Sequence, residues 1–136
     1  MKDLESLNHL SENKFPALLG IKMTQISDSQ VRAEMEVEES HLAPNGYLHA
    51  GSVVSLADTT CGNGCIAHLP DGASGFTTIE LKSNHLGTVV DGVVECVAKP
   101  VHLGKSTQVW DATVKSKGSN KTIALFRCTQ MVLYSR

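Results

Sequence analysis

The chain has 136 residues, of which 41% are hydrophobic, and a net charge of −2 with a sequence pI of about 6.3. This length predicts a single domain, residues 1–136, with a core of modest size. The charge balance provides no basic surface for nucleic acid and no polybasic patch for a membrane. Because no apolar run could cross a bilayer and no signal peptide is recognisable, we expect a cytoplasmic protein.

The apolar pattern predicts an α+β domain. Leucines at three-residue spacing predict a short helix over 2–11, and alternating apolar and charged residues over 31–37 predict a strand with one wet face, paired with an apolar run over 18–26. Pro44, Asn45 and Gly46 mark a loop before a long helix. Further strands are expected over 74–86, 90–101, 106–116 and 121–134. Six strands and one long helix predict a sheet curled around that helix.

The long helix, ending near residue 69, contains the most informative residue. Asp58 is the only Asp, Glu, Lys or Arg between Glu39 and Asp71. A surface helix of this length normally carries several charges on its outer face. Both faces of this helix are therefore suited to burial. An ionised carboxylate is costly there unless hydrogen bonds or a functional role stabilise it, so Asp58 is the leading candidate for a reactive group.

Other common reactive groups are not supported by the sequence. The four cysteines form no CxxC pair and lie among apolar or small residues, which predicts buried, reduced thiols. No GxSxG motif is present. The histidines and carboxylates show no spacing typical of a metal site, so we expect no metal. The cysteines are Cys61, Cys65, Cys96 and Cys128.

Three motifs in order carry a resemblance to a known family. The segment HAGSVVSLAD at 49–58 resembles the HGG-x6-D/E signature of hotdog-fold acyl-CoA thioesterases. TTIELKSNHL at 77–86 is similar to the TxELxxxxL strand of that family, and VHLGKSTQVWD at 101–111 to its HxGRxxxxWE strand. The nearest kinds are the phenylacetyl-CoA, 4-hydroxybenzoyl-CoA and siderophore-proofreading thioesterases. The resemblance implies a six-stranded antiparallel sheet around a central helix.

The resemblance also implies hydrolysis of an acyl thioester, with no cofactor because coenzyme A is part of the substrate. Asp58 matches the acid of the family and would act as general base on water or as nucleophile; the sequence leaves both open. The N–H groups of Ala50 and Gly51 open the central helix and would form the oxyanion hole. His49 would position the loop or the carbonyl, and Asn45 would orient the water or the leaving thiolate.

Further roles follow from the same motifs. Thr78, or Thr77 beside it, matches a residue that hydrogen-bonds the water and would come from a neighbouring subunit. Lys105, with Lys82 as a weaker candidate, would bind the coenzyme A phosphates. His102 would line the nucleotide groove or pack.

The chain also departs from the family at three positions. Ala50 replaces the first glycine of the helix motif. Gly62 stands where one subfamily has Thr or Ser, and Ala43 where one has glutamine. These departures keep a catalytically weak acyl-CoA-binding protein as an alternative.

The expected protein is therefore a homodimer or homotetramer with its active site at a subunit interface, because pairing sheet edges closes them and completes the site. The expected substrate is a small or medium acyl-CoA or carrier-protein thioester, with aromatic acyl groups included. A dehydratase of the same fold is a further alternative, although its His and Asp motif is not found in this sequence.

Overall fold

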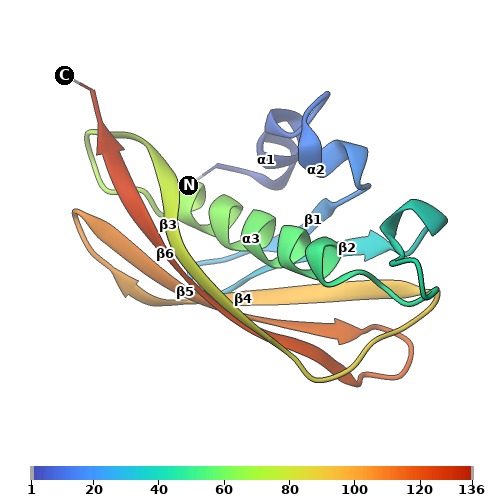
Figure 1. Ribbon diagram of the computed structural model, residues 1–136. Coiled ribbons are helices and arrows are strands. Elements are labelled where there is room, and N and C mark those ends of the chain that lie inside the picture. The colour runs from blue at the N-terminus through green and yellow to red at the C-terminus, as the bar shows by residue number, and fades with distance from the viewer. Residues whose placement is uncertain (1, 136) are drawn as a thin grey trace.

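The computed structural model describes residues 2–135 and consists of one sheet, one long helix and two short N-terminal helices (Figure 1). The 18-residue helix α3 crosses the concave face of the sheet, as predicted (Figure 1). Strand neighbours are all antiparallel, in the order β1-β2-β4-β5-β6-β3. The elements are α1 Leu4–Leu10, α2 Phe15–Leu18, β1 Lys22–Ile26, β2 Val31–Glu36, a 3-10 turn Glu39–His41, α3 Ala50–Ala67, β3 Ala73–His85, β4 Val93–Leu103, β5 Thr107–Ser116 and β6 Thr122–Tyr134.

One sequence prediction is wrong at the N-terminal side. The apolar run over 18–26 does not form one strand, because Pro16 lies in the first turn of the short helix α2 and Gly20 follows with a φ of 76°. Proline favours the start of a helix and glycine tolerates a positive φ after its end. Leu18 consequently lies in α2 and is 82% exposed, and β1 begins only at Lys22.

The core lies between α3 and the sheet. Val31, Ala33 and Met35 of β2 are fully buried, which confirms the predicted alternation. From the opposite side, Leu56 and Cys61 of α3 are also fully buried. Burial of this apolar surface is the main force that holds the helix on the sheet. All four cysteines are buried and unpaired, as the sequence predicts.

Helix α3 packs closely because two of its glycines face aromatic rings. A Cβ at Gly64 would lie 2.7 Å from the Trp110 ring, and a Cβ at Gly62 would lie 2.8 Å from Phe76. Both distances are too short for a real contact, so the rings occupy the space that side chains would need. The departure at Gly62 therefore has a structural reason, since Phe76 fills the place of a side chain.

Three polar residues of α3 make side-chain hydrogen bonds to the backbone of the same helix. The hydroxyls of Ser55 and Thr60 donate to the backbone carbonyls of Gly51 and Leu56, and the Asn63 amide donates to Thr59. Such back-bonding to the carbonyl four residues earlier lets a polar side chain lie on a buried helix. It explains how α3 is covered on most of its surface while carrying so many hydroxyl and amide groups.

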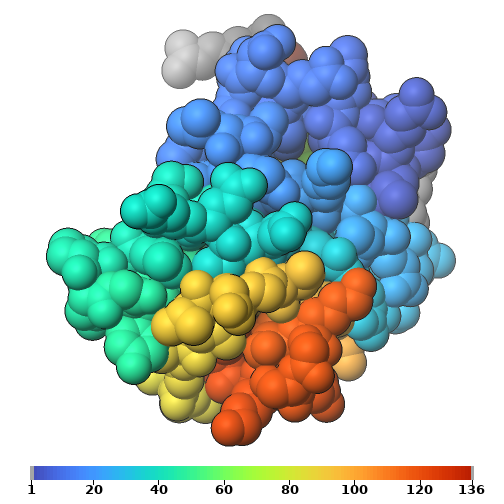
Figure 2. All heavy atoms as spheres, turned by 90° about the vertical axis from the view of Figure 1, so that its right-hand side faces the viewer, coloured from blue at the N-terminus to red at the C-terminus, as the bar shows by residue number. Residues whose placement is uncertain are grey.

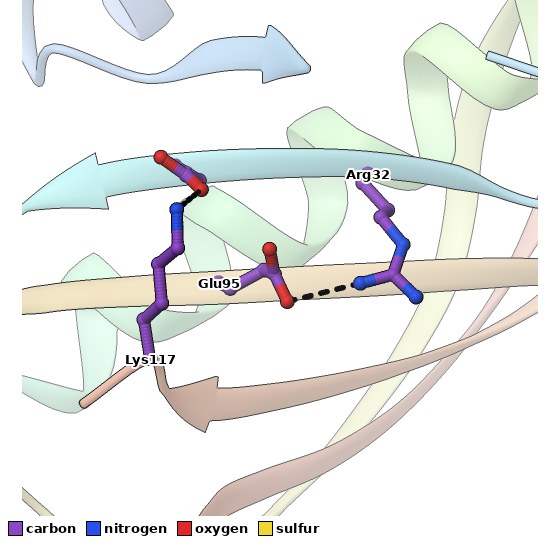
Figure 3. Close-up of polar contacts among 4 residues, drawn as sticks. Arg32, Glu95 and Lys117 are labelled. Atoms are coloured by element: carbon purple, nitrogen blue, oxygen red, sulfur yellow. Dashed lines mark hydrogen bonds and ion pairs between the residues drawn. The ribbon is translucent and has the colours of Figure 1, made fainter. Parts of the chain in front are cut away.

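The face of the sheet away from α3 carries charged side chains. Arg32 pairs with Glu95, and Lys117 pairs with Glu34 (Figure 3). Exposed pairs of this kind contribute little to stability, but they keep this face polar. Within residues 2–135, no helix is long and apolar enough to span a membrane.

Candidate active site

Asp58 lies on α3 beside the edge strand β3. The Thr78 hydroxyl donates to Asp58 Oδ1 over 3.0 Å. Burial raises the pKa of the Asp58 carboxyl, and the Thr78 hydrogen bond lowers it by a smaller amount. The side chain is half-buried, so the carboxylate is partly withdrawn from water without being sealed in the core. This is the environment expected of a base that must react with a ligand.

The link between Thr78 and Asp58 corrects one sequence prediction. The hydroxyl was expected to come from a neighbouring subunit, but Thr78 reaches the acid of its own chain. It can do so because Thr78 faces α3 from β3. Thr77 is on the opposite face and exposed, so it does not contribute to the surroundings of Asp58.

The N-terminus of α3 is capped by a side chain. His49 is the N-cap residue, and its Nδ1 accepts the Gly51 N–H at 2.7 Å. The imidazole hydrogen must then be on Nε2. A Cβ at position 51 would lie 3.0 Å from His49 Nδ1, so glycine is the residue that fits beside this ring without a shift. The predicted positioning role of His49 is consistent with this cap.

The cap distinguishes the two N–H groups of the predicted oxyanion pair. Gly51 N–H is occupied by His49, whereas Ala50 N–H has no hydrogen-bond partner among residues 2–135. An unpaired N–H at the start of a helix carries the partial positive charge of the helix dipole. Ala50 is therefore the better placed donor of the two for an oxyanion.

A pocket opens at this end of α3. It has a volume of about 420 Å³ and lies between the segment before α3 and the segment after β3. Figure 2 shows that these two segments lie against each other, and the Leu48 N–H donates to the Val89 carbonyl. The lining residues are Ala43, Asn45, Tyr47, Leu48, His49, Ala50, Val53, His85, Gly87 and Thr88. Sequence reasoning did not find His85 or Thr88, because neither stands in a position that the motifs mark as functional.

Asn45 is held in a turn. Its Oδ1 accepts the Tyr47 N–H at 3.1 Å, which is an Asx turn. The amide nitrogen of Asn45 makes no hydrogen bond among residues 2–135 and can donate to a ligand in the pocket. Ala43 lines the same pocket but has no polar side chain to offer.

The predicted coenzyme A residues do not gather around Asp58. His102 lies near the end of β4 and Lys105 in the turn that follows, where the Tyr134 hydroxyl donates to the Lys105 carbonyl. This turn is near the C-terminal end of α3, because Gln108 of β5 donates to the His68 carbonyl. Lys82 lies on the outer face of β3, beside Arg127. No group of three or more metal-ligating side chains converges in the part of the chain that the structure describes.

The fold and the half-buried acid agree with a thioester hydrolase, and comparison with known proteins shows that class. A family model for the thioesterase superfamily matches residues 45–123. The 1,4-dihydroxy-2-naphthoyl-CoA hydrolase of Listeria monocytogenes is 31% identical over 118 residues, which cover 87% of this chain and 94% of that protein. The chain therefore belongs to the thioesterase superfamily and is an enzyme of that family.

Solved structures confirm the hotdog fold. A mutant of the thioesterase PA1618 from Pseudomonas aeruginosa has a TM-score of 0.92 and 32% identity, over 98% of this chain and 95% of that chain. The thioesterase HI1161 from Haemophilus influenzae also has a TM-score of 0.92, with 30% identity over 98% and 92% of the two chains. Both matches extend over α1 and α2 as well as the sheet, so the N-terminal helices belong to the shared architecture.

Proposed function

We propose that the protein hydrolyses small or medium acyl-CoA thioesters, including aromatic ones, with Asp58 as the reactive acid. The observation that carries this proposal is the half-buried Asp58 carboxylate, held by Thr78 beside the open edge of β3. A carboxylate in this setting is suited to take a proton from water or to attack the thioester carbonyl directly. The naphthoyl-CoA substrate in the name of the Listeria relative supports an aromatic acyl group.

The proposed reaction requires two chains. Ala50 and Asp58 are eight residues apart on one helix, which corresponds to about 12 Å along its axis. An oxyanion lies about 3 Å from its N–H donor, and the attacking water lies at a similar distance from its base. One helix therefore cannot place both groups on one thioester. A second copy with its α3 running antiparallel would bring its own Ala50 opposite Asp58.

The open edge of the sheet favours that arrangement. β3 is an edge strand of 13 residues, and Asp58 contacts it through Thr78. Pairing of β3 with β3 of a second copy would extend the sheet and place the two α3 helices side by side on the same face. We propose a homodimer built in this way. Further association into a tetramer would use the outer faces of the two sheets.

Lys105, His102 and Lys82 are proposed to contact the nucleotide part of coenzyme A. In the antiparallel pair, the C-terminal end of α3 in one chain lies toward the N-terminal end of α3 in the other. Lys105 of the first chain then lies on the side of the site that contains Ala50 of the second copy. A lysine ammonium there would attract the phosphates as a point charge. Asn45 is proposed to contact the thioester through its free amide nitrogen.

The test is a thiol-release assay with a panel of aliphatic and aromatic acyl-CoAs. We expect hydrolysis by the wild-type protein, and a loss of kcat/KM of about 10²- to 10⁴-fold in Asp58→Asn. Asp71→Asn is the matched control, because Asp71 is exposed in the turn after α3. Hydrolysis that persists in Asp58→Asn would rule out this acid. In single turnover in ¹⁸O-water, label found in Asp58 would identify it as the nucleophile.

A second candidate function is acyl-CoA binding without efficient turnover. It is favoured by Ala43 and by the Asx turn of Asn45, which leave the pocket with few polar side chains to orient a water. Calorimetry with the same acyl-CoAs separates the two candidates. Tight binding with no thiol release on any thioester supports the binder, and thiol release that depends on Asp58 supports the enzyme.

A further inference from the structure

Two fully buried glutamines lie side by side on the sheet, and only one is satisfied. Gln108 of β5 accepts the Trp110 indole N–H at 2.8 Å and donates to the His68 carbonyl at 3.0 Å. Gln130 of β6 is equally buried, but neither its amide nitrogen nor its amide oxygen has a partner among residues 2–135. An unpaired buried amide costs free energy, so its presence calls for an explanation.

The strand register places Gln130 next to the candidate acid. Gln130 is the direct antiparallel partner of Gln108 on one side and of Thr78 on the other. Direct partners project from the same face with Cβ atoms about 4.5–5.5 Å apart. Gln108 makes one hydrogen bond at each end of its amide and none to Gln130, whereas Thr78, the direct partner on the other side, has a hydroxyl lone pair that can accept from Gln130. The Thr78 hydroxyl is the group that donates to Asp58.

We propose that Gln130 is a positioning residue that acts on Asp58 through Thr78. Its amide nitrogen donates to Thr78 Oγ1 in the working enzyme. A hydroxyl has one hydrogen and two lone pairs, so a donor into a lone pair leaves the hydrogen directed at the carboxylate. The donation also polarises the hydroxyl and strengthens its bond to Asp58. The inference rests on the proposed function in taking Asp58 as the reactive acid.

No other charged group facing this part of α3 takes over that task. Apart from Asp58, the titratable groups turned toward it within residues 2–135 are the His68 imidazole, whose Nδ1 bonds to the Gly64 carbonyl, and the thiols of Cys61, Cys65, Cys96 and Cys128. A hydrogen bond with Cys128 and burial raise the pKa of Cys61, and burial raises the pKa of Cys96 to about 12. These two thiols are therefore neutral. The charged residues of the neighbouring strands project from the opposite face; they are Glu80, Lys82, Asp111 and Arg127.

The experiment compares Gln130→Met in the wild type and in Thr78→Val. Methionine keeps an unbranched buried side chain but cannot donate. We expect kcat to fall about 3- to 10-fold with KM within about twofold, which corresponds to one hydrogen bond. Loss of a bond that favours the carboxylate raises the pKa of Asp58, so the acid limb of the pH–rate profile moves to higher pH. In Thr78→Val, the second substitution is expected to have no further effect.

A control variant and a measurement of stability separate the proposed role from a loss of folding. Gln108→Met is expected to lower the Tm, because it breaks the bonds to Trp110 and His68, without moving the acid limb. Gln130→Met is expected to leave the Tm nearly unchanged, because the loss of the bond to Thr78 is offset by removal of the unpaired amide oxygen. If Gln130→Met does not fold, Gln130→Leu provides the same comparison with a different shape.

The titration of Asp58 provides a readout that does not need activity. Carboxyl ¹³C NMR, assigned with Asp58→Asn, follows the Asp58 midpoint, which we expect to rise in Gln130→Met. An unmoved midpoint and acid limb, or an equal loss of kcat in Thr78→Val, would overturn the inference. Absence of hydrolysis by the wild type would overturn the proposed function instead, and the NMR titration would still decide the role of Gln130.

Discussion

The two edges of the sheet are built in opposite ways. β1 has five residues, with a register shift between Met23 and Gln25, and its outer side is closed by α1. The Asn8 amide donates to the Met23 carbonyl at 3.1 Å, and its oxygen accepts the Met23 N–H at 2.9 Å. One side chain thus takes the place of a neighbouring strand. An edge closed in this way is protected from pairing with another chain.

The β3 edge has no such protection within the described part of the chain. It has 13 residues, and no side chain bonds to its outer backbone groups. Ile79 is 50% exposed and Leu81 is 42% exposed on this strand. A long, open and partly apolar edge normally pairs with another strand. The comparison indicates that the protein closes the edge far from Asp58 and leaves open the edge that bears Thr78.

The largest expected effect comes from a charge on the open edge. Leu81→Lys should prevent pairing of two β3 strands and separate the acid of one chain from the helix start of the other. We expect a monomer by light scattering and a loss of hydrolysis of about 100-fold or more, because one chain cannot assemble the site. Gln25→Lys on β1 is the matched control and should change neither property. An active oligomer in Leu81→Lys would show that β3 is not the interface.

The next effect concerns the closed edge. Asn8→Ala removes both hydrogen bonds to Met23 and leaves two backbone groups of β1 without partners. We expect urea unfolding to show a loss of about 1–3 kcal/mol and the hydrolysis rate to remain close to that of the wild type. Ser6→Ala is the control on the same helix, because exposed Ser6 contacts Asp3 at the start of α1 and makes no hydrogen bond to β1 within residues 2–135. A large fall in activity without loss of stability would contradict the view that the β1 edge serves stability and the β3 edge serves the active site.

The third effect concerns Lys105, which lies on neither edge strand of the sheet. Lys105 is exposed in the turn between β4 and β5. Lys105→Ala is expected to raise KM about 3- to 10-fold for acyl-CoA and to leave kcat nearly unchanged, because a solvent-exposed contact to phosphate is worth about 1 kcal/mol. An acyl-N-acetylcysteamine thioester, which has no phosphate, should show no change. An equal rise in KM for both substrates would remove Lys105 from phosphate binding.

The smallest expected effect is the cost in stability of the acid beside the open edge. Burial raises the pKa of Asp58 above its ordinary value of 3.8. The folded protein therefore holds the Asp58 proton more tightly than the unfolded chain does. The stability that this group contributes is present below pH 3.8 and is lost as the pH rises through the folded pKa. Asp58→Asn should raise the Tm at pH 7 relative to the wild type. The difference should disappear below pH 3.8, and differential scanning calorimetry across this pH range would measure it.

Much of this architecture could be predicted from the sequence. Apolar alternation predicted β2, and the absence of charges between Glu39 and Asp71 predicted a covered helix with one exceptional acid. These features are local, because the spacing of apolar residues along a strand or helix indicates which of its faces is buried. The failure at Leu18 was also local: Pro16 and Gly20 outweighed the apolar run.

The candidate site was predicted less completely. Motif spacing pointed to Asp58, Thr78 and the start of α3, and the structure brings Asp58 and Thr78 together. Spacing did not reveal that His49 occupies the Gly51 N–H, because a cap depends on the rotamer of a ring. It also gave no sign of Gln130, whose nearness to Thr78 depends on strands that are far apart in the sequence.

The sequence by itself determined which residues are apolar, where the single acid lies on α3 and which segments extend as strands. These are properties of residues close together in the chain, so they can be predicted from the amino-acid sequence alone. Only the tertiary structure decided which strands became edges, which of the two edges Asn8 closed, and which buried glutamine was left without a partner. Those outcomes depend on pairing across long stretches of chain, where the register of one strand fixes what the next side chain meets.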